Sequence, residues 1–99
     1  MLESLITSQT RIKLLVRFFL NQSNQGYLRG LADEFSESSN AIRVELNRFE
    51  KAGLLVSFIK GNKKMYKANP NHPLSRDIHS IVLKYVGIDN AIEELEPFI

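Results

Sequence analysis

The sequence contains no cysteine and no long apolar run, and its five glycines are scattered. The absence of cysteine excludes disulfide bonds and thiolate metal sites, and it suits a reducing cytosol. No segment approaches the roughly 18 apolar residues of a membrane span. The first residues, which include the acidic Glu3, do not resemble a signal peptide. There is no glycine-rich phosphate loop and no nucleophile motif, so we expect a cytoplasmic protein that is not an enzyme.

Charge is distributed unevenly along the chain, although its 99 residues carry a net charge of only +2. Residues 1–70 hold eleven lysines and arginines against six acidic residues, a balance of +5. Residues 71–99 hold two against five, a balance of −3. This asymmetry indicates a polyanionic partner for residues 1–70 and a different role for residues 71–99, which we expect to serve dimerisation or partner docking.

Hydrophobic periodicity predicts a first helix after the N-cap Ser8. One face of this helix holds Ile12, Leu15, Val16 and Phe19. Leu14 and Phe18 make the apolar face wider, which predicts burial on two sides, one of them against a second chain. Residues 21–27 are then predicted to form a turn.

Two further helices follow, over residues 28–35 and from Ser38 to the helix-ending Gly53. Short helices joined by such a turn form a helix-turn-helix. The runs "LLVSFIK" and "KKMYKAN" on either side of a Gly-Asn turn predict a β-hairpin. We expect one more helix over residues 74–86, ended by Gly87, and then a last short helix. The predicted fold is mainly α with a small β-hairpin, a winged helix-turn-helix with C-terminal helices.

A helical wheel divides the helix after Ser38 into two faces. The core stripe holds Ile42, Leu46 and Phe49. The outward face holds Asn40, Val44, Asn47 and Lys51, with Arg43 at its shoulder. Any surface helix shows polar residues outward, but these types also suit base edges in the major groove: arginine pairs with guanine, asparagine with adenine, and an apolar group contacts the thymine methyl. At the helix start, Ser38, Ser39 and Asn40 lie where backbone N–H groups and hydroxyls hold phosphate.

The hairpin is rich in lysine. Its cations are Lys60, Lys63, Lys64 and Lys67, with no acidic residue among them. Lysines also protect edge strands from aggregation. Next to a helix-turn-helix, however, they predict a phosphate-binding wing.

Residues 27–69 resemble the winged-helix core of bacterial ArsR/MarR-type transcriptional regulators, and the likeness covers about residues 8–70. The matching features are "LADEF", the serine-rich turn, the core position of Leu46, "EKAGLL" and a hairpin with a basic tip. The segment after the hairpin is also similar to the linker that follows such a domain in proteins where a nucleotidyltransferase-like domain comes next. The glycine-serine and paired-aspartate motifs of that enzyme are absent.

The resemblance implies sequence-specific binding of double-stranded DNA and regulation of transcription. It implies that Ser39, Asn40, Arg43 and Asn47 face the major groove. It also implies that Lys60, Asn62, Lys63 and Lys64 reach the backbone or the minor groove. A homodimer formed through the first and C-terminal helices is expected. Two alternatives stay open: a protein-interaction winged helix, or the non-catalytic half of a nucleotidyltransferase system.

The C-terminal helices are a candidate metal site, because some ArsR-like sensors bind zinc through Asp-x-His followed by His-x-x-Glu. Asp77, His79 and Glu93 match that spacing, but Asn90 occupies the position of the second histidine. Gly87 is also expected to break the helix that would carry the site. The remaining donors make a poor zinc site, so we expect no metal and no cofactor.

Overall fold

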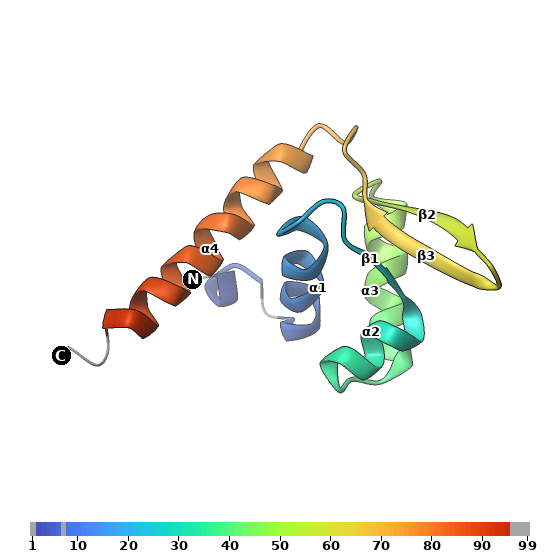
Figure 1. The fold of residues 1–99 in the computed structure, drawn as a ribbon, viewed down its shortest axis with the longest axis horizontal. Coiled ribbons are helices and arrows are strands. Elements are labelled where there is room, and N and C mark those ends of the chain that lie inside the picture. Colours follow the sequence, from blue (N-terminus) through green and yellow to red (C-terminus); the bar gives the residue numbers. More distant parts are fainter. Residues whose placement is uncertain (1, 7, 96–99) are drawn as a thin grey trace.

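The computed structural model describes residues 2–6 and 8–95, with the backbone alone for residues 88–95. Its elements are η1 (Leu2–Ser4), α1 (Gln9–Phe19), β1 (Gln25–Tyr27), α2 (Leu28–Phe35), α3 (Ser39–Lys51), β2 (Leu55–Lys60), β3 (Lys63–Ala68) and α4 (Ser75–Leu95). The strands form one antiparallel sheet in the order β1-β3-β2. In Figure 1 the β2–β3 hairpin and α4 extend to opposite sides of the body formed by α1, α2 and α3. The predicted fold class, a three-helix core with a hairpin wing, is confirmed.

Serine side chains begin α1 and α3. The Ser8 hydroxyl accepts a hydrogen bond from the backbone N–H of Arg11 at 3.2 Å. The Ser38 hydroxyl accepts one from the N–H of Ala41 at 3.1 Å. Each bond satisfies a backbone donor that has no partner inside its helix, so both predicted N-caps are confirmed.

Left-handed residues end α2 and α3. Gly53 has a φ of +78°, and the N–H of Leu54 donates to the Phe49 carbonyl at 2.9 Å, which turns the chain out of α3 toward β2. Ser36 ends α2 in the same way, with a φ of 54°. A side chain in this conformation places its Cβ close to the following carbonyl oxygen, so Ser36 carries strain that a glycine would not.

Replacing Ser36 with glycine is therefore expected to raise the free energy of unfolding by about 0.5–1 kcal/mol. Ser80, an exposed residue within α4, provides the matched control, and its replacement by glycine is expected to lower the free energy by about 0.5 kcal/mol. Urea denaturation of both variants checks the prediction. A loss of stability in the Ser36 variant would show that the backbone there is unstrained.

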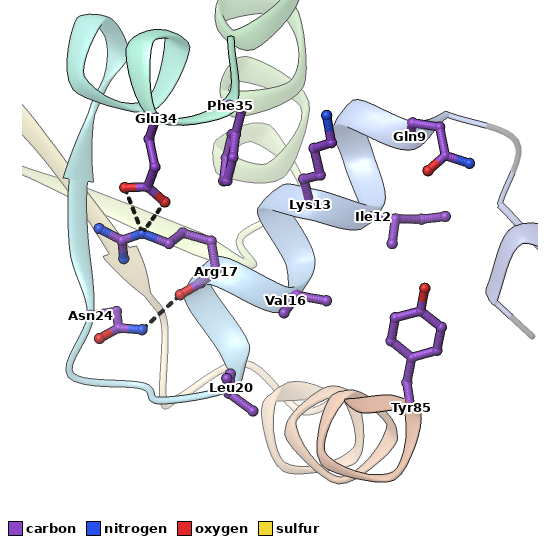
Figure 2. Close-up of a pocket in the computed structure, with 10 residues that line it drawn as sticks. All are labelled: Gln9, Ile12, Lys13, Val16, Arg17, Leu20, Asn24, Glu34, Phe35 and Tyr85. Atoms are coloured by element: carbon purple, nitrogen blue, oxygen red, sulfur yellow. Dashed lines mark hydrogen bonds and ion pairs between the residues drawn. The ribbon is translucent and has the colours of Figure 1, made fainter. Parts of the chain in front are cut away.

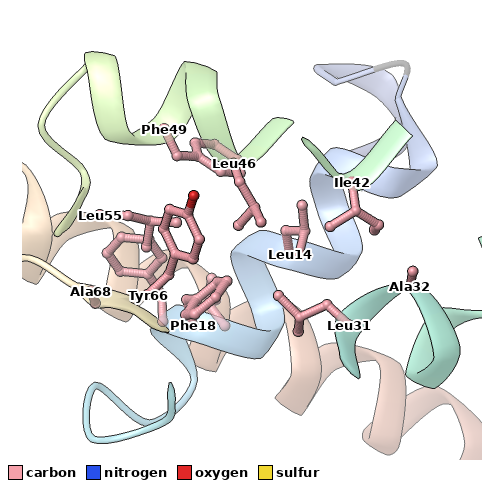
Figure 3. Packing of buried hydrophobic residues seen from close by; sticks show 12 residues of the cluster. Leu14, Phe18, Leu31, Ala32, Ile42, Leu46, Phe49, Leu55, Tyr66 and Ala68 are labelled. Carbon is pink, nitrogen blue, oxygen red and sulfur yellow. The ribbon is translucent and has the colours of Figure 1, made fainter. Parts of the chain in front are cut away.

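The hydrophobic core lies between α1, α2, α3 and the sheet. Figure 3 shows Leu14 and Phe18 of α1 close to Ile42 and Leu46 of α3, and all four side chains are at most 1% exposed. The core stripe predicted for α3 is confirmed, with Phe49 buried as well. The wide apolar face of α1 was predicted to reach a second chain. Leu14 and Phe18 are buried completely by their own chain and are not available to a second one, whereas contact of the rest of this helix with a second chain stays a prediction.

Strand β1 lies in the segment predicted as a turn. Its residues pair with β3, Gln25 opposite Lys67 and Tyr27 opposite Met65. Between them, a Cβ on Gly26 would come within 3.0 Å of the Leu31 side chain, so a glycine allows the strand to approach α2 closely. The strand is too short to show an alternation of apolar and polar residues in the sequence. It forms because its residues pair with β3.

Helix α4 continues through Gly87, where the sequence predicted a stop and a second helix. A glycine within a helix costs only about 1 kcal/mol relative to alanine, and no left-handed turn follows this one. The start of α4 is fixed to the loop after α1, since the Gln22 amide donates to the buried Ser75 hydroxyl at 3.0 Å. The side chains predicted to form the last short helix, from Ile88 onward, lie outside the described residues.

Candidate nucleic-acid interface

The outward face of α3 has the composition that the wheel predicted. Asn40, Arg43, Val44, Asn47 and Lys51 are all exposed, and so are Ser38 and Ser39 at the helix start. The core stripe on the opposite side holds α3 against α1 and α2, which fixes the rotation of the helix about its axis. The Ser38 hydroxyl accepts the capping bond described above and keeps its own proton, so Ser38 and Ser39 can both donate at this end, together with backbone N–H groups other than that of Ala41.

An open groove of about 600 Å³ separates α3 from the wing. Its lining residues are Tyr27, Leu28, Arg29, Arg43, Asn47, Asn62, Lys63, Lys64 and Tyr66. The groove brings Arg43 and Asn47 of α3 together with Asn62, Lys63 and Lys64 of the wing. Among the residues that the structure describes, the lining includes no carboxylate, so the groove favours an anionic ligand.

Two of the predicted cations lie elsewhere. Lys51 is exposed near the C-terminal end of α3 and does not line the groove. Lys60 lines a neighbouring hollow of about 320 Å³ together with Asn62 and Lys63. The wing therefore presents cations on both sides of its tip.

Arg29 was not predicted, although it lines the groove from the first turn of α2. A signal for it was present in "LRGLADEF". Leu28, Leu31 and Phe35 form the inner side of this helix, and Arg29 falls outside that stripe. The arginine adds a third element, α2, to the positive surface.

Lys64 is less free than the sequence indicated. Its ammonium lies 3.2 Å from a carboxylate oxygen of Glu50 on α3, and the Ser57 hydroxyl donates to the same carboxylate at 2.5 Å. The Ser57 bond, and after it the Lys64 bond, lowers the pKa of Glu50 below its ordinary value. Glu50 is thus ionised at neutral pH and neutralises part of the Lys64 charge.

Glu45 is the acidic residue nearest the centre of α3, and the fold turns it inward. It is 6% exposed, and the Arg11 side chain on α1 donates to it through Nε at 2.8 Å. This bond raises the pKa of Arg11. Arg48 lies 3.6 Å from the other carboxylate oxygen. Glu45 is therefore buried and paired, and Glu50 is the α3 carboxylate that lies next to a cation of the groove.

A second opening, shown in Figure 2, lies between α1, α2 and α4 and has a volume of about 440 Å³. Its wall is mostly apolar, with Ile12 and Val16 facing Tyr85 across it. The charged groups at one edge pair with each other, since Arg17 Nε lies 3.0 Å from Glu34. The two cations that line this opening, Lys13 and Arg17, each pair with a glutamate.

Of the candidate zinc ligands, Asp77 and His79 have side chains that the structure describes. His79 Nδ1 hydrogen-bonds the Phe19 carbonyl at the end of α1. Within the described part of the chain, no group of three histidine, aspartate or glutamate side chains is placed to hold a metal. The expected helix break at Gly87 was wrong, as noted above, and the Glu93 side chain lies outside the described residues. No helix across residues 2–6 and 8–95 is long and apolar enough to cross a membrane.

Comparison with solved structures identifies the fold. No protein-family model matches the chain, and no curated protein does either. The adhesin competence repressor AdcR from Streptococcus pyogenes aligns with a TM-score of 0.73 at 14% identity, over 99% of this chain and 73% of its own. MepR, a transcription regulator of the Staphylococcus aureus multidrug efflux pump MepA, aligns with a TM-score of 0.65 at 15% identity, over 98% of this chain and 76% of its own. The transcriptional regulator BldR from Sulfolobus solfataricus aligns with a TM-score of 0.66 at 15% identity, over 99% of this chain and 68% of its own.

These likenesses show the fold alone, because the identities are low. The chain has the winged-helix fold of MarR-type transcription regulators, and the resemblance seen in the sequence is confirmed at that level.

Proposed function

We propose that this chain binds double-stranded DNA in a sequence-dependent manner and regulates transcription, without catalysis, in the cytoplasm. The observation that carries the proposal is the groove in which Arg43 and Asn47 of α3 meet Asn62 and Lys63 of the wing. The fold of the three regulators supports it.

Helix α3 would read bases in the major groove. Arg43 is suited to guanine, Asn40 and Asn47 to adenine, and Val44 to a thymine methyl. These four side chains are exposed along the outward side of the helix, so one docking position serves them all.

Other residues would contact phosphate and set the docking position. Ser39 and the N–H groups at the start of α3 would bind one strand, with Ser38 acting as the cap. Lys51, Lys60 and Lys63 would bind flanking phosphates. Arg29 joins them, whereas Lys64 contributes less because Glu50 neutralises it.

A homodimer would let two copies read half-sites about one DNA turn apart. The apolar residues Leu74, Ile81 and Leu83 are 47–53% exposed on or next to α4, which leaves part of residues 71–99 available for a second copy. The first helix would contribute less than the sequence suggested, since Leu14 and Phe18 are already buried.

Replacing Arg43 with alanine is expected to relax base preference at one operator position, at a cost of about 1–3 kcal/mol for the preferred base. Replacing Arg48 with alanine is the matched control. It removes the same charge from the same helix, but Arg48 lies beside Glu45 and off the groove. Titrations of a selected operator and its single-base variants, at constant salt, check this. Equal effects of the two substitutions would contradict base reading by Arg43.

Replacing Lys63 with alanine is expected to weaken binding to all DNA sequences alike and to reduce the salt-dependence slope by about 1. One phosphate contact releases about one counterion, which is why the slope and not the base preference changes. Lys67, on the same strand but outside the groove, serves as the control. If the Lys63 variant keeps the full slope, the wing does not contact phosphate.

A further inference from the structure

Tyr27 joins the wing to the helix-turn-helix. It is the last residue of β1, where it pairs with Met65 of β3, and it is also the N-cap residue of α2. Its side chain makes no capping hydrogen bond, so the ring is available for other contacts. Tyr27 lines the α3 groove and also the hollow beside Lys60. The residue therefore lies where the wing, α2 and the positive surface meet.

The Tyr27 ring is held closely by its surroundings. The Lys63 ammonium lies 4.2 Å from the ring centroid, within the range of a cation–π contact. Gly30 also lies close to the ring. A Cβ added at this glycine would come within 2.8 Å of Tyr27 Cε1. Gly30 thus leaves the space that the ring occupies, and Lys63 lies over it. The contact fixes a long side chain that would otherwise sample many rotamers.

The neighbouring lysine is fixed from the other side of the groove. Lys64 pairs with Glu50 of α3, while Lys63 pairs with Tyr27 next to α2. Lys63 and Lys64 are the first two residues of β3, directly after the turn at Gly61 and Asn62. Two adjacent residues therefore attach the wing tip to both helices of the helix-turn-helix.

We propose that Tyr27 is a positioning residue for DNA binding, whose ring holds the Lys63 ammonium and the wing tip at the edge of the α3 groove. This inference rests on the proposed function. A Lys63 ordered in advance loses less conformational entropy when it meets a phosphate, so binding is tighter than with a free side chain. The contact also leaves the ammonium able to donate to phosphate, because an aromatic ring accepts no full hydrogen bond from it.

The free protein provides the first test. Proton NMR of Lys63 is expected to show upfield-shifted side-chain methylene signals, caused by the Tyr27 ring current. Replacing Tyr27 with phenylalanine should keep the shift, and replacing it with leucine should remove it. Normal methylene shifts in the unmodified protein would overturn the proposal, whether or not DNA binds.

DNA binding provides the second test, with melting curves to show that each variant is folded. Tyr27→Leu is expected to weaken binding about two- to fivefold, the effect of an exposed cation–π contact. Tyr27→Phe should bind like the unmodified protein. Combining Tyr27→Leu with Lys63→Ala should weaken binding no further than Lys63→Ala alone. Phe58→Leu is the control, since Lys67 lies 5.7 Å from that ring but outside the groove.

The outcomes separate the two proposals. Additive losses from Tyr27→Leu and Lys63→Ala, in a protein that binds DNA, would overturn the positioning role alone. A loss in Tyr27→Phe would assign the effect to the hydroxyl and also overturn it. No DNA binding by the unmodified protein would overturn the proposed function itself.

Discussion

Replacing Phe18 with alanine is expected to lower the free energy of unfolding by about 3–5 kcal/mol. Phe18 has no exposed surface and lies in the cluster that joins α1 to α3 and the sheet. Its removal takes away buried apolar area and leaves a cavity that the surrounding helices fill only in part. For a domain of this size, with a total stability of about 5–15 kcal/mol, such a loss is a large share.

Phe58 offers the matched control, because it is the same residue type in a half-buried position on β2. Its replacement by alanine is expected to cost about 1 kcal/mol. Urea denaturation, with equal slopes for the variants, measures both. Similar losses at the two positions would contradict the core described for α1.

Replacing Arg11 with methionine is expected to lower the free energy of unfolding by about 3 kcal/mol. The substitution keeps an apolar stem but leaves the carboxylate of Glu45, whose side chain is 8% exposed, without its closest partner. Arg11 is itself one-third exposed and Arg48 stays nearby, which puts the effect at the low end for a buried pair. The loss arises mainly from an uncompensated buried charge.

The double variant Arg11→Met with Glu45→Leu separates this cause from lost packing. With both charges replaced by apolar groups, most of the lost stability should return. Calorimetric melting of the single and double variants gives the coupling between the two positions. If the double variant is less stable than Arg11→Met alone, charge burial does not explain the effect.

The parts of the fold that the sequence predicted are those with local causes. Ser8 and Ser38 cap helices through neighbouring N–H groups, and Gly53 supplies a left-handed turn, so short segments contained the information. Strand β1 was missed because it exists through pairing with β3, more than 35 positions along the chain. The prediction at Gly87 was wrong because a glycine can either end a helix or lie within it. The composition of the segment does not decide between these two possibilities.

In the candidate site, too, the features with local causes were predicted and those that depend on tertiary contacts were not. The wheel placed Arg43 and Asn47 outward from their spacing alone, and both are exposed. The neutralisation of Lys64 by Glu50 and the contact of Lys63 with Tyr27 depend on how the wing packs against α3 and β1. Such contacts between distant segments follow from tertiary structure and leave no periodic signal in the sequence.

Selection of bound sequences from a pool of random duplex DNA, followed by a salt titration of the enriched sequence, tests the central claim most directly. DNA recognition by α3 and the wing of two copies predicts one enriched operator with half-sites about one turn apart. It also predicts an affinity that falls linearly with salt on logarithmic axes. No enriched sequence, or an affinity that does not change with salt, would contradict DNA recognition by α3 and the wing and would favour a protein-interaction module.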